Sequence, residues 1–168
     1  MTSGPILGFD ADNVEFDAAS EDNGTMTNLV SRRQFIIEWG HCDPAGIVFN
    51  GRFFEFFDWG TWTLFEAALG VKRSDLIAVF GIMGLPVVDV RVSFHAPARF
   101  GDVVDLSSQV GQFRRSSFDI EHRLFVRGAL AVEGLETRVW ASYDAADPSQ
   151  IKSQPVPEDV ITRLQAGV

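Results

Sequence analysis

Three residues with reactive side chains stand side by side in the stretch "GHCDPAGIVF", at His41, Cys42 and Asp43. Pro44 and Gly46 follow them, which predicts a loop, and a segment rich in Phe comes next. A cysteine nucleophile needs a base within hydrogen-bond reach. Because neighbouring side chains of an extended segment point to opposite sides, His41 is poorly placed to activate Cys42. We therefore expect Cys42 to be a buried, unreactive thiol.

The three histidines and the single cysteine do not predict a metal site. No pair among His41, Cys42, His95 and His122 has a spacing typical of metal ligands. His122 falls on the apolar face of a predicted strand, which is typical of a core histidine whose hydrogen bonds are satisfied. We expect no metal, and one cysteine excludes an intrachain disulfide.

Asp43 is the third candidate, and its position has two interpretations. It precedes Pro44, which disfavours helical backbone at Asp43 and holds it extended. It also comes just before a predicted buried helix, whose first N–H groups have no partner within the helix. A carbonyl bound there would be polarised, with the carboxylate close to its carbon. Alternatively, Asp43 caps a turn and Asn50 caps the helix.

The elements that position this loop are a strand before it and a helix after it. Residues 29–39 are rich in strand-forming side chains and end at Gly40. Residues 51–69 have helix length and carry apolar side chains around almost the whole circumference, which predicts a buried helix. Gly70 stands where a helix C-terminus favours glycine. Gly60 disfavours the helix, and close packing against a neighbour would explain it.

The second half of the chain predicts an antiparallel sheet. A short helix over 74–80, capped by Ser74, precedes it. Side chains then alternate between apolar and polar over 88–94, 104–110 and 118–126, and a fourth run reaches Tyr143. Pro157 opens a short final helix that ends near Gln165. The fold class is α+β, with an antiparallel sheet covering one apolar helix.

Length and charge limit the partners. A chain of 168 residues is most simply one domain, which we place at 29–168. Residues 1–28 contain six acidic residues and no Lys or Arg, which predicts a flexible acidic tail. The net charge of −9 argues against nucleic acid or an anionic membrane as partner. We find neither a spanning segment nor a signal peptide and expect a cytoplasmic protein.

The stretch "GHCDPAGIVF" resembles the active-site loop of the 4-hydroxybenzoyl-CoA thioesterase family, and Asp58 recurs on the helix. "GQFRRSSF" and "GIMGLPVV" resemble two further segments of that family, so the likeness covers residues 29–143. The resemblance implies the hotdog fold, in which an antiparallel sheet wraps a long central helix. It also implies hydrolysis of an aryl or medium-chain acyl-CoA. Coenzyme A is then part of the substrate, and no cofactor is needed.

The resemblance also implies roles for particular residues. Asp43 would attack the thioester or activate water, and the N–H at or beside Asn50 would hold the thioester oxygen. The phosphates of coenzyme A would be held by a basic segment made of Arg114, Arg115, Ser116 and Ser117. Some members of the family have Tyr at the position of Asn50, which alters the surface that faces the acyl group. Two other carboxylates lie on the helix, at Glu55 and Asp58, and we expect Asp58 to make a structural hydrogen bond.

Other functions remain open. A hotdog hydratase would pair its Asp with a His four or five residues later, where this chain has Ile47 and Val48. A non-catalytic module that binds acyl-CoA or acyl carrier protein would keep the pocket without turnover, and Asp43 argues against it. A thioesterase acting on acyl carrier protein would need a local basic patch, because the protein and the carrier are both acidic. The resemblance implies a homodimer or homotetramer, and the predicted strands contain few Lys residues to protect an edge.

Overall fold

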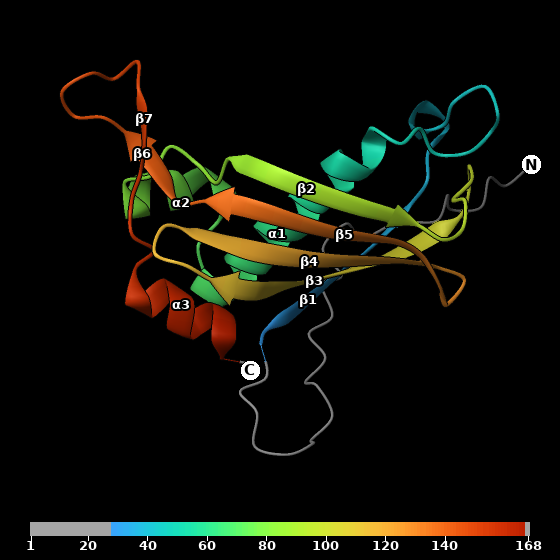
Figure 1. Ribbon diagram of the computed structural model, residues 1–168. Coiled ribbons are helices and arrows are strands. Elements are labelled where there is room, and N and C mark those ends of the chain that lie inside the picture. The colour runs from blue at the N-terminus through green and yellow to red at the C-terminus, as the bar shows by residue number, and fades with distance from the viewer. Residues whose placement is uncertain (1–27, 167–168) are drawn as a thin grey trace, which may run out of the picture.

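The computed structural model describes residues 28–166, so nearly all of the predicted acidic tail lies outside the described residues. A five-stranded antiparallel sheet forms most of the fold, with strand order β1-β3-β4-β5-β2. Its strands are β1 (Val30–Ile36), β2 (Val87–Phe94), β3 (Val103–Phe113), β4 (Ser117–Val126) and β5 (Ala129–Val139). The alternating runs therefore form the predicted strands, and β1 and β2 are the two edges of the sheet (Figure 1).

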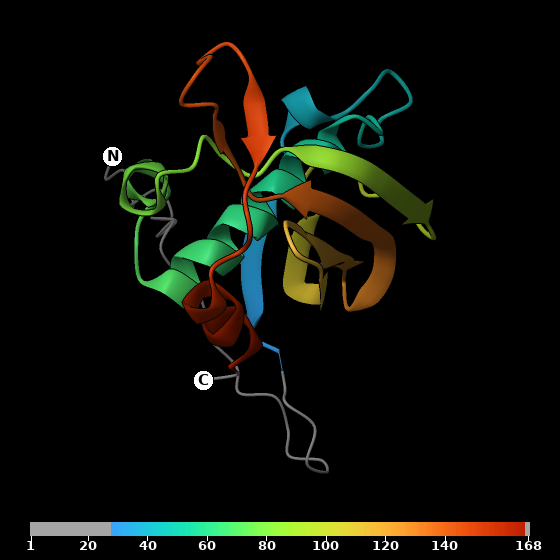
Figure 2. The same cartoon turned by 60° about the vertical axis from the view of Figure 1, so that its left-hand side comes forward.

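Helix α1 (Arg52–Leu69) lies against one face of this sheet, and the sheet curls around it (Figure 2). Most of its Phe side chains lie in the core, where Phe56, Phe57 and Phe65 are fully buried, whereas Phe54 is exposed. Alternate side chains of each central strand point into the same core, as in β4, where Phe118 and Leu124 are buried. The predicted α+β fold with a sheet around a buried helix is confirmed.

The two glycines of the predicted helix have the expected roles. Gly70 ends α1 in the left-handed conformation, with φ 66°, and its N–H bonds the carbonyl of Glu66 at 2.9 Å. Gly60 lies against β3, where a Cβ atom would stand 2.3 Å from Ser108 Oγ. Glycine at position 60 therefore allows α1 to approach the sheet closely.

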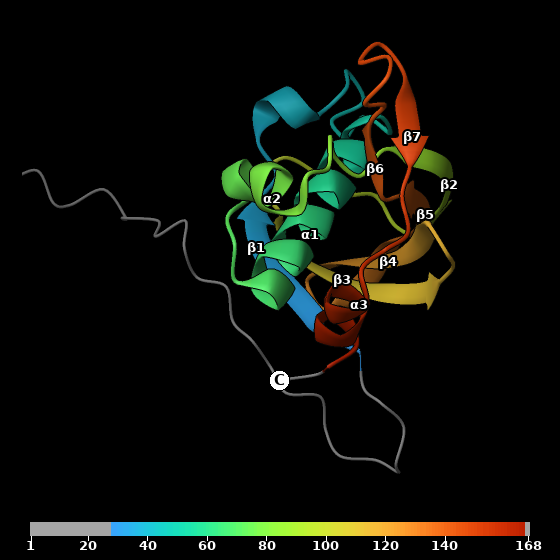
Figure 3. The same cartoon turned by 90° about the vertical axis from the view of Figure 1, so that its left-hand side faces the viewer.

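Two predicted boundaries are wrong, the end of the first strand and the start of the second helix. Strand β1 ends at Ile36, and Trp39 belongs instead to the 3₁₀ turn η1 (Trp39–His41). Helix α2 (Arg73–Phe80) includes Ser74, so Ser74 is not its cap. The Lys72 carbonyl accepts the N–H groups of Asp75 and Leu76, and the Ser74 hydroxyl donates to the Asp75 carboxylate. Figure 3 shows α2 beside α1, away from β4 and β5.

The fourth predicted run is two strands rather than one. After β5, the strand β6 (Ala141–Tyr143) leaves the large sheet and pairs with β7 (Ile151–Ser153), which the sequence analysis missed. The resulting hairpin projects from one end of the molecule (Figure 1). Helix α3 (Glu158–Gln165) follows Pro157 as predicted and packs on α1. Within residues 28–166, no helix combines the length and apolarity that crossing a membrane requires.

Candidate active site

Asp43 lies at the tip of a tight hairpin between β1 and α1. The Asp43 N–H bonds the Ile47 carbonyl, and the Gly46 N–H bonds the Asp43 carbonyl, both at 2.9 Å. At the base of the hairpin, the N–H of Phe49 bonds the carbonyl of His41 at 2.9 Å. The hairpin is tied to the loop after β2, because Val48 N–H donates to an alanine carbonyl there. Asp43 is therefore held by backbone hydrogen bonds on both sides.

The Asp43 carboxylate keeps part of its bonding capacity free. Oδ1 accepts the N–H of Ala45 at 2.8 Å, so the side chain does cap a turn, as the alternative interpretation expected. Within the part of the chain that the structure describes, Oδ2 has no hydrogen bond and the carboxylate has no ion pair. Asp43 is also half-buried rather than fully exposed. One carboxylate oxygen therefore remains available to react.

The start of α1 supplies free N–H groups next to this carboxylate. Gly51, and not Asn50, is the N-cap, and no side chain caps it. Arg52 and Phe53 donate their N–H groups to the carbonyls of Phe49 and Asn50. Among residues 28–166, the N–H groups of Asn50 and Gly51 have no acceptor. The predicted capping role of Asn50 is thus wrong, but the unpartnered N–H groups expected there are present.

A groove of about 600 Å³ joins the carboxylate to the helix start. It is lined by the Asp43 hairpin, the first turn of α1 and the chain after β2, namely Asp43, Ile47, Val48, Phe49, Asn50, Phe53, Phe94, His95, Ala96, Pro97 and Ala98. Most of this lining is apolar, and the rings of Phe53 and Phe94 meet edge to face with centroids 5.4 Å apart. The structure therefore brings Asp43 and Asn50 together at one apolar groove.

The other two residues of the loop do not form a nucleophile pair. Cys42 is half-buried, whereas we expected a fully buried thiol. Its sulfur lies 3.9 Å from the Glu38 carbonyl oxygen. The His41 ring accepts the N–H of Glu38 through Nδ1 at 3.0 Å, which leaves Nδ1 unable to act on Cys42. Within the described residues, no three His, Cys, Asp or Glu side chains form a group that could hold a metal ion.

The basic segment Arg114–Ser117 comprises the turn between β3 and β4 and the first residue of β4. Arg114 makes a two-pronged ion pair with Asp119, at 2.8 and 2.9 Å. This guanidinium lowers the pKa of the Asp119 carboxyl. Arg115 is exposed, and its side chain makes no hydrogen bond or ion pair within residues 28–166. Of the two arginines among the predicted phosphate ligands, Arg115 is therefore the one whose side chain is free to bind.

This basic segment lies at the opposite end of the sheet from the groove. Phe94, in the groove, pairs with Val132 of β5, whereas Ser117 pairs with Val139 of the same strand. Seven residues of strand separate the two positions, or about 23 Å at 3.3 Å per residue. Within one chain, the structure does not bring Asp43 and Arg115 together.

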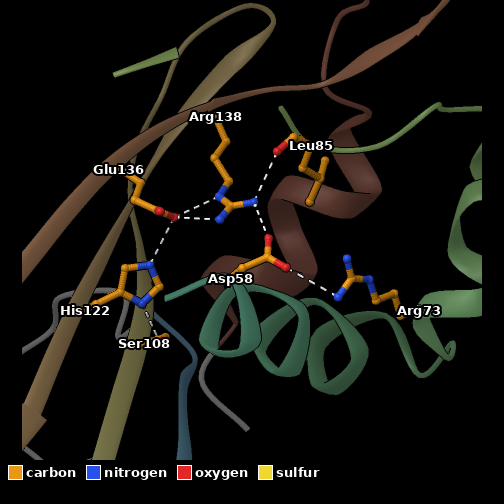
Figure 4. Close-up of polar contacts among 7 residues, drawn as sticks. All are labelled: Asp58, Arg73, Leu85, Ser108, His122, Glu136 and Arg138. Carbon is orange, nitrogen blue, oxygen red and sulfur yellow. Dashed lines mark hydrogen bonds and ion pairs between the residues drawn. The ribbon is translucent and has the colours of Figure 1, made fainter. Parts of the chain in front are cut away.

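A buried polar network under α1 contains charged residues that the sequence analysis missed (Figure 4). His122 bonds Ser108 at 2.8 Å and Glu136 at 3.3 Å, which confirms the prediction of a satisfied core histidine. Glu136 also accepts from Arg138 at 2.8 Å, and Arg138 donates to Asp58 at 3.0 Å. The expected structural hydrogen bond of Asp58 is therefore present. The sequence does contain a signal for this network, because Glu136 and Arg138 stand at positions of β5 whose side chains face the core.

Burial and ion pairing shift the pKa values of His122 and Glu136 in opposite directions. Burial lowers the pKa of His122, and this outweighs the effect of Glu136, which raises it. Burial would raise the pKa of Glu136, but the hydrogen bond from His122 and the charge of Arg138 lower it below its usual range. The network thus holds a neutral imidazole beside an ionised carboxylate.

Comparison with known proteins now gives the family. The family model described as "Thioesterase-like superfamily" matches residues 37–164. The chain belongs to this superfamily. It is 31% identical over 131 residues to 4-hydroxybenzoyl-CoA thioesterase of Pseudomonas sp. strain CBS-3, covering 74% of this chain and 90% of the relative. The predicted resemblance to the 4-hydroxybenzoyl-CoA thioesterase family is confirmed.

Two further matches agree with this assignment. The crystal structure of a mutant 4-hydroxybenzoyl-CoA thioesterase complexed with 4-hydroxybenzoyl-CoA matches with a TM-score of 0.73 and 27% identity, over 80% of this chain and 98% of that chain. A 1,4-dihydroxy-2-naphthoyl-CoA hydrolase of Synechococcus elongatus is 25% identical over 91 residues, covering 54% of this chain and 66% of the relative. The likeness confirms the hotdog fold and membership in a family of thioester hydrolases.

Proposed function

We propose that this chain hydrolyses aryl-CoA thioesters to a free acid and coenzyme A, with Asp43 as the reacting carboxylate. The observation that carries the proposal is one groove lined by both Asp43, which has a free carboxylate oxygen, and Asn50, which has a free N–H. Its aromatic wall favours a flat acyl group, and a medium-length acyl chain would also suit it. The relatives named above act on aromatic acyl-CoA substrates, which supports the aryl preference.

The chemistry follows from the charges that develop. The thioester oxygen would accept the N–H of Asn50 or Gly51, and these donors would stabilise the negative charge on that oxygen. Asp43 would then attack the carbonyl carbon, the C–S bond would break, and the CoA thiolate would leave. Water would hydrolyse the resulting anhydride. Alternatively, Asp43 would take a proton from the attacking water. A thiol has a pKa near 8.5, so the thiolate leaves with little acid assistance.

The basic turn would hold the nucleotide part of coenzyme A. Arg115 is exposed and free, and Ser116 and Ser117 lie beside it, which suits an anionic phosphate. Arg114, held by Asp119, would contribute charge more than direct bonds. Replacing Arg115 by Ala is expected to raise KM for acyl-CoA about tenfold with little change in kcat. No further cofactor is needed.

We also propose that two copies associate through β2. This edge strand leaves Val88 62% exposed and Phe94 55% exposed, and a long apolar edge is a template for pairing with another chain. A second copy, as a homodimer or within a homotetramer, would also supply another Arg115 at a different place relative to the groove. Light scattering on the full chain, compared with a Val88→Lys variant, tests the association.

The deciding experiment measures the release of free CoA from 4-hydroxybenzoyl-CoA, benzoyl-CoA and straight-chain acyl-CoAs. Asp43→Asn should lose about a hundredfold or more in kcat, a usual size for a lost acid or base. Glu55→Gln is the matched control, because Glu55 is an exposed carboxylate paired with Arg52 on α1. Equal activity of Asp43→Asn and wild type would move the search to Asp58 or Glu55. No turnover of any substrate would favour a non-catalytic module that binds acyl-CoA or acyl carrier protein.

A further inference from the structure

His41 fixes the hairpin that carries Asp43 at two points. Its carbonyl accepts the N–H of Phe49, where the hairpin closes and the chain turns into α1. Its ring accepts the N–H of Glu38 through Nδ1 at 3.0 Å, where the chain leaves β1. A backbone N–H can only donate, so Nδ1 is the acceptor in this hydrogen bond. One residue therefore holds both the entry and the exit of the loop.

The His41 ring also contacts the helix that supplies the free N–H groups. It meets Phe56 of α1 edge to face with centroids 5.2 Å apart, and it lies against Trp59 at 6.5 Å. His41 is not among the residues that line the groove. Its ring therefore faces the helix rather than a bound substrate, which excludes direct contact with the reacting atoms in this arrangement.

We infer that His41 is a positioning residue, whose Nδ1 acceptor holds the Asp43 hairpin in register with the start of α1. The Asp43 carboxylate lies on the hairpin and the Asn50 N–H lies at the start of α1, and both must contact the same thioester carbonyl group. His41 connects these segments through its Phe49 and Glu38 hydrogen bonds and its packing on Phe56. Loss of the acceptor lets the hairpin shift, and a misplacement of about 1 Å can cost up to a hundredfold in rate. The inference rests on the proposed hydrolysis.

The test compares two amides that place the same acceptor at different points. In His41→Asn, the amide oxygen stands near the position of Nδ1, whereas in His41→Gln it reaches toward Nε2. His41→Leu removes the acceptor but keeps an apolar side chain against Phe56. We expect the Asn variant to keep kcat within about twofold of wild type, and the Gln and Leu variants to lose about tenfold. KM should change less than about threefold in all of them, because the residues that line the groove are intact.

A second comparison shows whether His41 acts through Asp43. If it does, His41→Leu combined with Asp43→Asn should be within about twofold of Asp43→Asn alone, because there is no carboxylate left to position. Thermal melts of each variant separate a loss of rate from a loss of folded protein. If the Leu variant does not fold, the comparison of the Asn and Gln variants still tests the role of the Nδ1 acceptor.

Three results overturn the inference while leaving the proposed function standing. They are an Asn variant as slow as the Gln variant, a Leu variant with the kcat of wild type, and losses that multiply in the double variant. A wild-type protein that releases no CoA from any thioester would instead overturn the proposed function, and the role of His41 with it. The same assay therefore distinguishes the two failures.

Discussion

Asp43 and Glu136 carry the same functional group in opposite surroundings. Asp43 is half-buried beside an open groove, with one hydrogen bond from Ala45 and a free oxygen. Glu136 is 2% exposed and bonds both His122 and Arg138. A carboxylate that must react with a substrate needs unused bonding capacity, whereas a carboxylate in the core needs all of it used.

The two regions also differ in how their charge is balanced. In the buried network, Glu136 faces Arg138, and Arg138 reaches Asp58, which contacts Arg73 at the surface. Each charge has a partner of opposite sign, so the core holds ions without a net charge. Within residues 28–166, the Asp43 carboxylate accepts one hydrogen bond, from the backbone N–H of Ala45, and has no ion pair. The groove therefore keeps a localised negative charge.

The largest effect is expected when the buried carboxylate of Glu136 is removed. Glu136→Leu leaves Arg138 buried without its main partner, and the free energy of unfolding should fall by about 3–5 kcal/mol. Glu133→Leu is the matched control on the same strand, because Glu133 is 42% exposed and pairs with His95. It should cost less than about 1 kcal/mol. Urea unfolding of both variants checks this, and equal losses would contradict it.

The second prediction separates rate from stability at the other carboxylate. Asp43→Asn should reduce kcat about a hundredfold, or about 2.7 kcal/mol in activation free energy. Its free energy of unfolding should stay within about 0.5 kcal/mol of wild type, because the amide oxygen can still accept the Ala45 N–H. The CoA-release assay and urea unfolding measure the two quantities. A variant that loses stability in proportion to activity would place Asp43 with the structural carboxylates.

The third prediction tests how closely α1 approaches the buried network. In Gly60→Ala the added Cβ would meet Ser108 Oγ at 2.3 Å, and the strain should cost about 1–3 kcal/mol. Helix propensity alone would predict a gain of about 1 kcal/mol. Gly40→Ala is the control, since a Cβ at Gly40 meets no atom within 4 Å. Urea unfolding gives the sign, and a stabilised Gly60→Ala would contradict the close packing.

The same contrast explains what the sequence predicts and what it leaves hidden. The central helix and the four long strands follow from apolar periodicity, and the Asp43 loop follows from its reactive side chains beside Pro44. Strand β7 has three residues, which is too short for a period to appear. The Ser74 cap was wrong because the helix begins one residue earlier, at Arg73.

Longer-range arrangements depend on strand register, which local patterns do not fix. Glu136 and Arg138 stand at inward positions of β5, but their partners His122 and Asp58 come from β4 and α1. Likewise, the sequence does not show that the turn at Arg115 and the groove lie at opposite ends of the sheet. Residue types predict which groups are capable of chemistry, and the pairing of strands decides which of them meet.

The smallest expected effect concerns pH and sharpens the comparison at His122. Burial lowers its pKa below the ordinary 6.5, although Glu136 and Asp58 oppose this, while Arg138 adds to it. As the pH falls below about 6.5, the unfolded chain binds a proton that the folded chain does not, so stability falls. Glu136, whose pKa is also lowered, adds a further loss below its ordinary 4.5. We expect a slope of up to about 1.4 kcal/mol per pH unit for one proton.

Urea unfolding at pH 7.5, 6.5 and 5.5 measures this slope before most surface carboxylates titrate. His122→Gln removes the titrating group and should flatten the slope between pH 6.5 and 5.5. His95→Gln, at an exposed histidine outside the buried network, is the matched control for the same substitution. An unchanged slope in His122→Gln would mean that another group titrates in this range. A flattened slope in that variant alone would show that the fully bonded core, rather than the open groove, sets the acid sensitivity of the fold.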